Sequence, residues 1–436
     1  MISVLNHLQQ LSGNKYIILG IVCLVLSCSN KQYAIEQHKL KSDYEKQQNK
    51  PKETKDNQIL VKKTPVDSSD HVYPIIKKNS YTIVFILPLN LDPNNLYESQ
   101  QKGIARSALE YYMGSVIALQ KESERSKSNF KVYVFDCRNK TGSITSEIIP
   151  ELKKIQPDLI IGPFFSEQMN LLYNYCNENK INLLNPLISP DSFINLNPYF
   201  FNLRPSEKTH LGYIVKLLNS NFLQYNISIL AESNQDKDRY LKTIRSLIDT
   251  NRFGEIQAYK ADETNWRNPY FVKNMKDGKN VFIIFNKNNE VVINSLLTNL
   301  IGIQNKAETA IIAPYSWLYQ NTIDLGFLQS LNSHFITDYY FNYNDSCNFD
   351  FISRFRNKFN NEPNIMACIG YGFTDYFCSR LQDEGIYFQR DFKATPTIDS
   401  TVLIQFVRLP GQLSFQNYHM TILHYEGSEL KQLNLK

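Results

Sequence analysis

The run Thr82-Ile83-Val84-Phe85-Ile86-Leu87, which ends at Pro88, sets the fold class of this 436-residue chain. It is short, continuous and rich in β-branched residues, as is typical of a strand buried on both faces of a parallel sheet. A long helix is predicted over 99–121, because its apolar residues recur at spacings of three and four: Ile104, Ala108, Tyr111, Tyr112, Val116 and Leu119. A second strand is predicted over 130–135.

Strand and helix patterns go on alternating along the chain. Further strands are predicted at 159–161, 181–184, 227–230, 255–259, 281–285 and 310–313, with helices near 143–155, 166–178, 237–250, 289–301, 349–360 and 365–381. The alternation restarts after 199–204, and a further crossing is predicted near 335–337. This order is the pattern of βαβ units, so the sequence predicts an α/β fold with mostly parallel sheets flanked by helices. The C-terminal region is predicted to be β-rich, with His419 and His424 on opposite faces of one strand.

The first residues have the pattern of an export signal. Lys15 precedes an apolar run over 16–26, which is too short to span a bilayer but has the length of a signal-peptide core. Val25-Leu26-Ser27-Cys28 resembles the cleavage box of bacterial lipoproteins, so residues 1–27 are predicted to be a lipoprotein signal peptide and Cys28 the acylated residue. An ordinary cleaved signal and a short buried helix are the alternatives.

Residues 28–78 are predicted to form a disordered, basic tether, because they lack apolar periodicity. Residues 31–78 hold 11 Lys and 7 acidic residues, which accounts for most of the chain's formal net charge of +5. The remainder is near neutral, which argues against nucleic-acid binding. With 42% hydrophobic and 13% aromatic residues, the chain as a whole has enough apolar surface for a large core.

Cysteine usage argues against a metal site. Loss of Cys23 with the signal and acylation of Cys28 would leave five cysteines, an odd number, so at least one thiol stays free or pairs between chains. None of the five forms a C-x-x-C pair, and no metal ligand set or cofactor is predicted.

Four stretches together resemble the type I periplasmic binding proteins, in particular the branched-chain amino-acid receptor (Leu/Ile/Val-binding) branch and its lipoprotein members. They are 113–119, where a glycine in the first helix allows close approach to the sheet; 158–166, with its Gly162-Pro163-Phe164-Phe165-Ser166 turn; 181–189 followed by 197–204; and 351–372. The resemblance covers about 81–436 and implies two lobes joined by three crossings, with a ligand cleft between them. It divides the chain into lobe 1 at 79–203 and 338–390, and lobe 2 at 204–337 and 391–436.

The resemblance places candidate ligand contacts at the carboxyl ends of strands. In lobe 1, Ser166 either caps the helix that it begins or contacts a ligand, and backbone N–H groups at that helix start favour an anion. Ser189 is a second hydroxyl contact or an ordinary turn serine, and Asp136 is a ligand contact or a capping carboxylate. Phe164 and Phe165 either wall an apolar pocket or pack in the core.

The second lobe departs from the amino-acid receptors, which carry an acid after the strand read here as 310–313. This chain has Pro314-Tyr315-Ser316-Trp317 instead. An unpaired, buried ammonium costs several kcal/mol, so a zwitterionic amino acid is an unfavourable ligand unless Glu232 or Asp338 substitutes. Tyr315, Trp317, Tyr339 and Tyr340 either stack on an apolar or sugar-like ligand or form a closed lobe interface.

No enzyme is predicted, because the G-x-S-x-G, P-loop, H-E-x-x-H and G-x-G-x-x-G motifs are absent from the sequence. Two hypotheses remain. The first is a lipid-anchored periplasmic solute receptor working with an ABC-type permease, for amino-acid-like ligands. The second is an envelope scaffold resembling the outer-membrane lipoprotein activators of penicillin-binding proteins, with a cell-wall synthase as partner and a cell-wall fragment as ligand. Ser29 after the cysteine favours the outer over the inner membrane.

Overall fold

A computed structural model describes residues 74–91, 99–125, 128–138, 141–260, 278–285, 289–304, 307–392 and 403–435. These residues divide into two compact units, the first comprising 74–206 and 340–419, the second 207–339 and 420–435. The predicted signal peptide, Cys28 and nearly all of the predicted tether lie outside the described residues. None of the described helices is long and apolar enough to cross a membrane.

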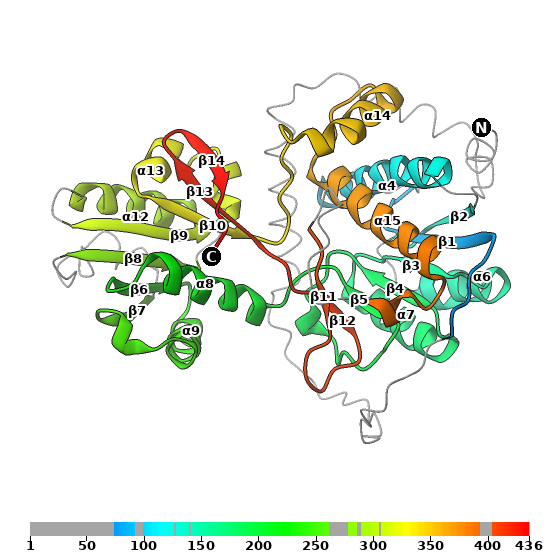
Figure 1. The fold of residues 1–436 in the computed structure, drawn as a ribbon, viewed down its shortest axis with the longest axis horizontal. Coiled ribbons are helices and arrows are strands. Elements are labelled where there is room, and N and C mark those ends of the chain that lie inside the picture. The colour runs from blue at the N-terminus through cyan, green and yellow to red at the C-terminus, as the bar shows by residue number, and fades with distance from the viewer. Residues whose placement is uncertain are drawn as a thin grey trace. The chain divides into compact units, whose positions relative to one another are not determined.

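The first unit is built on a seven-stranded sheet in the order β11-β12-β5-β4-β3-β1-β2 (Figure 1). Its strands are β1 (Ser80–Leu87), β2 (Asn129–Asp136), β3 (Leu159–Ile161), β4 (Asn182–Asn185), β5 (Phe200–Asn202), β11 (Phe406–Val407) and β12 (Phe415–Asn417). All pairs are parallel except β11 with β12. The run at 83–87 is fully buried, as its composition predicts.

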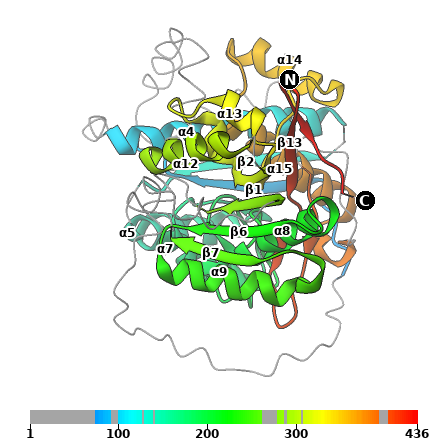
Figure 2. The same cartoon turned by 90° about the vertical axis from the view of Figure 1, so that its left-hand side faces the viewer.

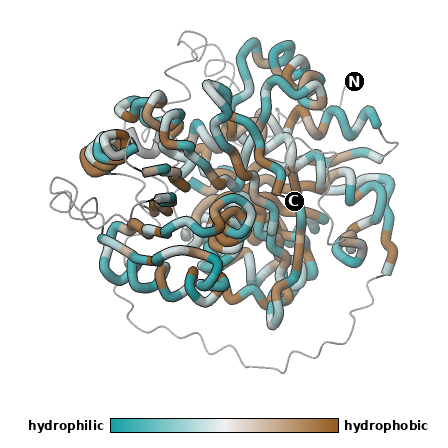
Figure 3. Tube along the Cα trace, turned by 60° about the vertical axis from the view of Figure 1, so that its left-hand side comes forward, coloured by the Kyte–Doolittle hydropathy of each residue, from teal (hydrophilic) through white to brown (hydrophobic). Residues whose placement is uncertain are grey.

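Helices of the first unit are α4 (Ser99–Arg125), α5 (Thr141–Ser143), α6 (Ile149–Ile155), α7 (Ser166–Asn179), α14 (Phe349–Phe359) and α15 (Ile365–Glu384). The helix predicted over 143–155 is not regular, because a π-helical segment, Ile144–Ile148, lies between α5 and α6. Ile144, Ile148 and Leu152 nevertheless stay buried against β1 and β4 in one apolar cluster. In Figure 3, which colours the chain by hydropathy, apolar and hydrophilic residues alternate along the helices.

The expected role of Gly114 is corrected by the packing of α4. A Cβ on Gly114 would lie 1.9 Å from the carbonyl oxygen of Ala367, and one on Gly370 would lie 2.0 Å from that of Tyr111. Both glycines therefore allow α4 and α15 to approach each other, and the contact is between two helices rather than between a helix and the sheet. Ser115 adds a polar contact, since its Oγ donates to the Gly370 carbonyl at 3.2 Å.

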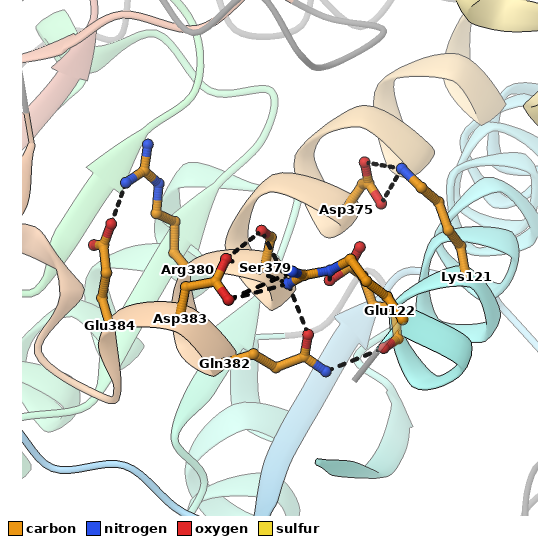
Figure 4. A network of polar contacts seen from close by, with 9 residues as sticks. Lys121, Glu122, Asp375, Ser379, Arg380, Gln382, Asp383 and Glu384 are labelled. Carbon is orange, nitrogen blue, oxygen red and sulfur yellow. Dashed lines mark hydrogen bonds and ion pairs between the residues drawn. The ribbon is translucent and has the colours of Figure 1, made fainter. Parts of the chain in front are cut away.

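Polar groups join the same two helices further along (Figure 4). Lys121 Nζ lies 2.8 Å from Asp375, and Arg125 Nη2 donates to Gln382 Oε1 at 3.0 Å. Arg125 also pairs with Glu122 on its own helix, at 2.8 Å. Burial raises the pKa of both Glu122 and Asp375, because it disfavours the charged carboxylates, although the cations offset part of that effect.

The second unit has its own seven-stranded sheet, in the order β14-β13-β10-β9-β8-β6-β7. Its strands are β6 (Asn226–Ala231), β7 (Ile256–Lys260), β8 (Lys279–Ile284), β9 (Glu308–Pro314), β10 (Ser333–Thr337), β13 (Thr421–Glu426) and β14 (Glu429–Gln432). Its helices are α8 (Glu207–Asn221), α9 (Asn234–Leu247), α12 (Glu290–Ile303) and α13 (Leu325–Ser330), which flank the sheet (Figure 2). The predicted α/β plan of two such halves is confirmed.

The C-terminal boundary differs from the predicted one. Residues 391–436 were expected in the second lobe, but β11 and β12 join the first sheet, where Phe415 pairs with Phe201. The rings of these two residues stack at a centroid distance of 5.1 Å within a large aromatic cluster, and this packing holds 403–419 on the first unit. Only β13 and β14 belong to the second unit. The strand β13 begins at Thr421, so the expectation that His419 and His424 share a strand is wrong.

Candidate functional site

Residues 162–166 form the turn that links β3 to α7 at the carboxyl edge of the first sheet. Gly162 has a φ of +90°, and a Cβ there would lie 2.2 Å from the Ile86 carbonyl oxygen, so only glycine fits between the ends of β3 and β1. The Gly162 amide donates to the Leu184 carbonyl at 3.1 Å, which fixes the turn against β4 as well. The start of α7 is thereby held at the edge where open α/β sheets bind ligands.

The two phenylalanines of this turn lie in different environments. Phe164 is buried, and its ring packs edge-on against Tyr111 of α4 at 5.6 Å, so it is a core residue. Phe165 is partly exposed and is the N-cap residue of α7. Ser166 is the first residue inside the helix, so the expectation that its side chain caps α7 is wrong by one position.

The N-terminus of α7 is suited to an anion. Its N-cap residue, Phe165, has no side-chain acceptor to offer the first amide groups of the helix. Such N–H groups carry the positive end of the helix dipole and bind carboxylates and phosphates. Ser166 lies beside them, partly exposed, with a hydroxyl that can donate to the same ligand.

Ser189 and Asp136 make local contacts at the same edge. The Ser189 hydroxyl accepts from the Asp191 amide at 3.4 Å and donates to the Asp191 carboxylate at 3.2 Å, as a turn serine does. The Asp136 carboxylate accepts from the amides of Asn90 at 3.1 Å and Leu91 at 2.9 Å. Asp136 therefore ties the chain after β1 to the end of β2, which is the capping role.

In the second unit, the aromatic residues predicted for the site are mostly buried. Trp317, in the 3-10 helix Tyr315–Tyr319 that follows β9, is 0% exposed, and Tyr339 is 2% exposed. Tyr315 is only partly buried, and its hydroxyl contacts that of Tyr319 at 2.6 Å. Of the aromatic residues predicted to stack on a ligand there, Tyr315 thus has the most accessible ring, whereas Tyr340 belongs to the first unit.

Carboxylates do occur at the carboxyl edge of the second sheet, although none follows β9. Glu232 directly follows β6 and is exposed, and Asp338 directly follows β10 and is partly buried. Since the carboxyl ends of parallel strands share one edge of a sheet, Glu232 and Asp338 lie at the same edge of the second sheet.

The structure adds a stacked group at this edge that the sequence analysis missed. Phe285, directly after β8, stacks on Tyr240 of α9 at a centroid distance of 3.7 Å, and the Arg239 guanidinium lies 4.4 Å from the same Tyr240 ring. Glu207 of α8 accepts from the Tyr240 hydroxyl at 2.8 Å and pairs with Arg239. Burial alone would raise the pKa of Glu207, but hydrogen bonds from Arg239 and Tyr240 outweigh it and lower that pKa.

The sequence offers only one indication of the group formed by Phe285, Arg239 and Tyr240, which is the position of these residues relative to predicted elements. Phe285 is the last residue of the strand predicted over 281–285, and Arg239-Tyr240 falls in the predicted helix over 237–250. Nothing in the sequence indicates that these residues meet Glu207, more than thirty positions away along the chain from Arg239.

Among the described residues, the chemistry of catalysis or metal binding is sparse. They hold no group of three or more His, Cys, Asp or Glu residues able to bind a metal ion. The five cysteines after the predicted signal and anchor are all free thiols, four of them buried, and Cys347 is exposed. Burial raises the pKa of the buried thiols, for example Cys176, which makes them poor nucleophiles.

No protein-family model and no curated protein matches the chain. Solved structures do match its fold. A putative branched-chain amino acid ABC transporter protein from Rhodospirillum rubrum matches with a TM-score of 0.63 and 11% identity, over 81% of this chain and 100% of that one. An ABC-type branched-chain amino acid transporter protein from Rhodopseudomonas palustris matches with a TM-score of 0.57 and 11% identity, over 81% and 95%.

An ABC transporter substrate-binding protein from Desulfitobacterium hafniense, solved in complex with Leu, matches with a TM-score of 0.52 and 13% identity, over 81% of this chain and 100% of that one. The two-unit α/β architecture described above is therefore the type I periplasmic-binding-protein fold. Within that class, two of these neighbours are described as branched-chain amino acid ABC transporter proteins and the third as an ABC transporter substrate-binding protein.

Proposed function

We propose that this chain is the substrate-binding component of an ABC-type transport system and binds a small, carboxylate-bearing solute without altering it. The observation that carries the proposal is the fold match, which spans the whole of a branched-chain amino acid transporter protein at a TM-score of 0.63. The Desulfitobacterium hafniense neighbour was solved with Leu, which is the kind of solute we infer here.

The start of α7 is the inferred anchor for the solute carboxylate. The first amides of α7 and the neighbouring Ser166 hydroxyl are hydrogen-bond donors. The N-cap residue, Phe165, has no side-chain atom that could accept from these amides. The turn at Gly162 holds this helix start rigidly against β1 and β4. A rigid set of donors binds an anion with little loss of conformational entropy.

The solute's other end is less closely defined. An amino acid needs a carboxylate for its ammonium, and Glu232 and Asp338 are the acids at the carboxyl edge of the second sheet. A carboxylate solute without an ammonium needs neither of them. We therefore propose that the solute is amino-acid-like, with Glu232 or Asp338 as the ammonium partner, and that a non-amino carboxylate is the competing ligand class.

The cellular setting is inferred from the sequence and from the neighbours' transport role. Val25-Leu26-Ser27-Cys28 has the pattern of a lipoprotein cleavage box, so we propose acylation at Cys28 and a position on the periplasmic side of a membrane. The residue after the cysteine, Ser29, supports the outer membrane by resemblance to lipoprotein sorting signals.

The N-cap position offers a sharp test. A Phe165→Asp substitution would place a carboxylate on the first amides of α7, where it caps the helix and repels a ligand anion. Phe165→Ala removes the same ring but leaves the amides available. Thermal unfolding of the whole mature chain, with and without leucine and related carboxylates, reports binding, since a solute at 100 times its Kd stabilises by about 2.7 kcal/mol.

We expect the wild type and F165A to be stabilised by a solute, and F165D to lose that shift while unfolding at no lower temperature than F165A. Equal solute shifts in F165A and F165D would show that α7 is not the anchor. If no solute in the screen shifts the wild type, and a cell-wall synthase co-purifies with it, the transport proposal is wrong and the envelope-scaffold hypothesis replaces it.

A further inference from the structure

The opposite, amino edge of the first sheet carries a second feature, made by the chain just before β1. Residues 74–79 are held there through their backbone and one lysine. The Ile386 amide donates to the Ile76 carbonyl at 3.0 Å, and Lys78 Nζ lies 2.6 Å from the Asp158 carboxylate. Gly385 makes room for this, because a Cβ there would lie 2.2 Å from the Ile76 carbonyl oxygen.

The side chains of this segment face solvent even though its backbone is fixed. Ile75 is 70% exposed, the highest value among the exposed large apolar residues of the described chain, and Ile76 is 38% exposed. Two adjacent isoleucines held in water by a fixed backbone lose the stabilisation that burial would give them. Exposed apolar side chains in such a setting indicate a surface that another phase or molecule covers.

Lysines converge beside the isoleucines. A pocket of about 280 Å³ is lined by Lys78, which precedes β1, by Lys153 of α6 and by Lys180, which precedes β4, together with Ile386 and Tyr387. Its lining includes one carboxylate, Asp158, which already accepts from Lys78 and from the Thr82 amide. Glu151 and Lys154 pair with each other at 2.7 Å, and neither lines the pocket. The pocket lining therefore holds three lysines and one acid.

We propose that this surface, the amino-edge patch (Ile75, Ile76, Lys78, Lys153 and Lys180), docks on an anionic lipid membrane. The isoleucines would enter the boundary between headgroups and acyl chains, and the lysine pocket would take a headgroup phosphate. An apolar pair beside a cluster of lysines is the combination that binds anionic membrane surfaces.

The position of the patch in the chain supports a membrane as the partner. The stretch that leads back to Cys28, residues 31–78, has a net charge of +4, and it enters the fold at this edge. The start of α7 lies at the opposite, carboxyl edge of the same sheet, so docking here would leave the candidate solute site open. The inference goes beyond solute binding and does not depend on it.

A tryptophan reporter tests the proposal in the whole mature chain. I75W places a fluorophore in the patch, and L247W places one on α9 of the second unit, at a leucine that is 44% exposed. Vesicles of phosphatidylglycerol and phosphatidylcholine with brominated acyl chains quench a tryptophan that reaches them. The wild type, with its two native tryptophans, gives the background. Any acyl anchor at Cys28 is common to all three chains.

We expect strong quenching of I75W that grows with phosphatidylglycerol content, and background quenching of L247W. Removing two positive charges from the pocket, as K153Q/K180Q, should weaken docking roughly 25-fold, since each lysine contributes about fivefold near an anionic surface. K208Q/K242Q removes the same charge from the second unit and should change docking less than twofold. Both pairs leave the contact of Lys78 with Asp158 intact.

Two results would overturn the proposal. One is I75W quenching that matches L247W or is the same in vesicles of pure phosphatidylcholine. The other is a thermal shift with glycerol phosphate in solution that K153Q/K180Q abolishes, with no vesicle dependence of I75W, which would assign the pocket to a soluble phosphate ester instead. Neither result bears on solute binding, which the Phe165 variants test separately.

Discussion

Substituting Gly370 by alanine tests how the first unit is held together. The new Cβ would lie 2.0 Å from the Tyr111 carbonyl oxygen and 2.8 Å from its carbon, well inside the 3.4 Å at which ordinary contact begins. Both obstructing atoms belong to the backbone of a long helix and cannot rotate aside. The helices α4 and α15 must therefore move apart by more than 1 Å.

The expected cost follows from three contributions. Overpacking a well-filled contact costs about 1–3 kcal/mol, and the upper end applies where only backbone can yield. Separation also weakens the bond from Ser115 Oγ to the Gly370 carbonyl, which contributes about 1 kcal/mol. Alanine recovers about 1 kcal/mol through its helix propensity. The net loss is about 3 kcal/mol, or roughly 10 °C in the unfolding temperature of a unit of this size.

Scanning calorimetry of the whole chain measures this loss, and Gly302→Ala is the matched control. Gly302 lies in α12 of the second unit, with no atom within 4 Å of a Cβ placed there, so G302A should stabilise by up to about 1 kcal/mol. G114A, whose Cβ would lie 1.9 Å from the Ala367 carbonyl oxygen, should resemble G370A. The double variant should cost less than the sum, because one clash already separates the helices.

Close packing of α4 on α15 through these glycines is contradicted if G370A unfolds at the same temperature as the wild type, or if its effect equals that of G302A. It is equally contradicted if G114A and G370A are additive, because independent effects would mean that the two glycines do not share one contact.

Three further predictions concern single residues. Burial lowers the pKa of His334 from 6.5 to about 4, because it disfavours the charged ring, so the unfolded chain binds the proton more tightly. The second unit should therefore lose about 3 kcal/mol of unfolding free energy as pH falls from 6.5 to 4. In calorimetric scans, H334Q should lose less stability over the same pH range. Asp158→Asn weakens the hydrogen bonds from Lys78 and from the Thr82 amide, and should cost about 1–3 kcal/mol of stability. The loss should appear as faster hydrogen exchange at the Ile386 amide, which donates to Ile76. Unchanged exchange would contradict the attachment of residues 74–79 described above. Of the five free cysteines, Cys347 should react with a thiol reagent in the native chain and the four buried ones only on unfolding, so stoichiometric labelling of more than one native thiol at these positions would contradict their burial.

Several strands and the α/β class could be predicted from the sequence because those strands are continuous apolar runs. The run at 83–87 is fully buried, and 281–284 and 310–313 are buried in the second sheet. Such runs need no knowledge of the partner strand, since both faces are covered by helices. The C-terminal strands are different. Phe406 and Phe415 lie in short strands of two and three residues, and their place in the first sheet depends on contact with Phe201, far away along the chain.

Candidate site residues were harder to predict because one residue type serves several structural roles. Asp136 ends a strand, as a ligand-binding acid would, yet its carboxylate accepts from two amides of the loop after β1. Trp317 follows a strand in the same way, yet it is fully buried. Position after a strand therefore does not suffice to identify a ligand contact, since the same edge must also close its own loops.

The start of α7 differs from those residues because its N-cap residue makes no side-chain capping hydrogen bond. Asp136 and Ser189 have their hydrogen-bonding groups engaged with neighbouring backbone or with Asp191. Phe165 offers no acceptor to the first amides of α7, at a helix start that Gly162 fixes in place. A helix start without a capping side chain is less stable than a capped one by about 1 kcal/mol, and we propose that a solute carboxylate accepts from these amides. Phe165→Asp therefore tests two effects at one position. The substitution should stabilise α7 and weaken solute binding. If the start of α7 has only a structural role, the first effect will appear without the second.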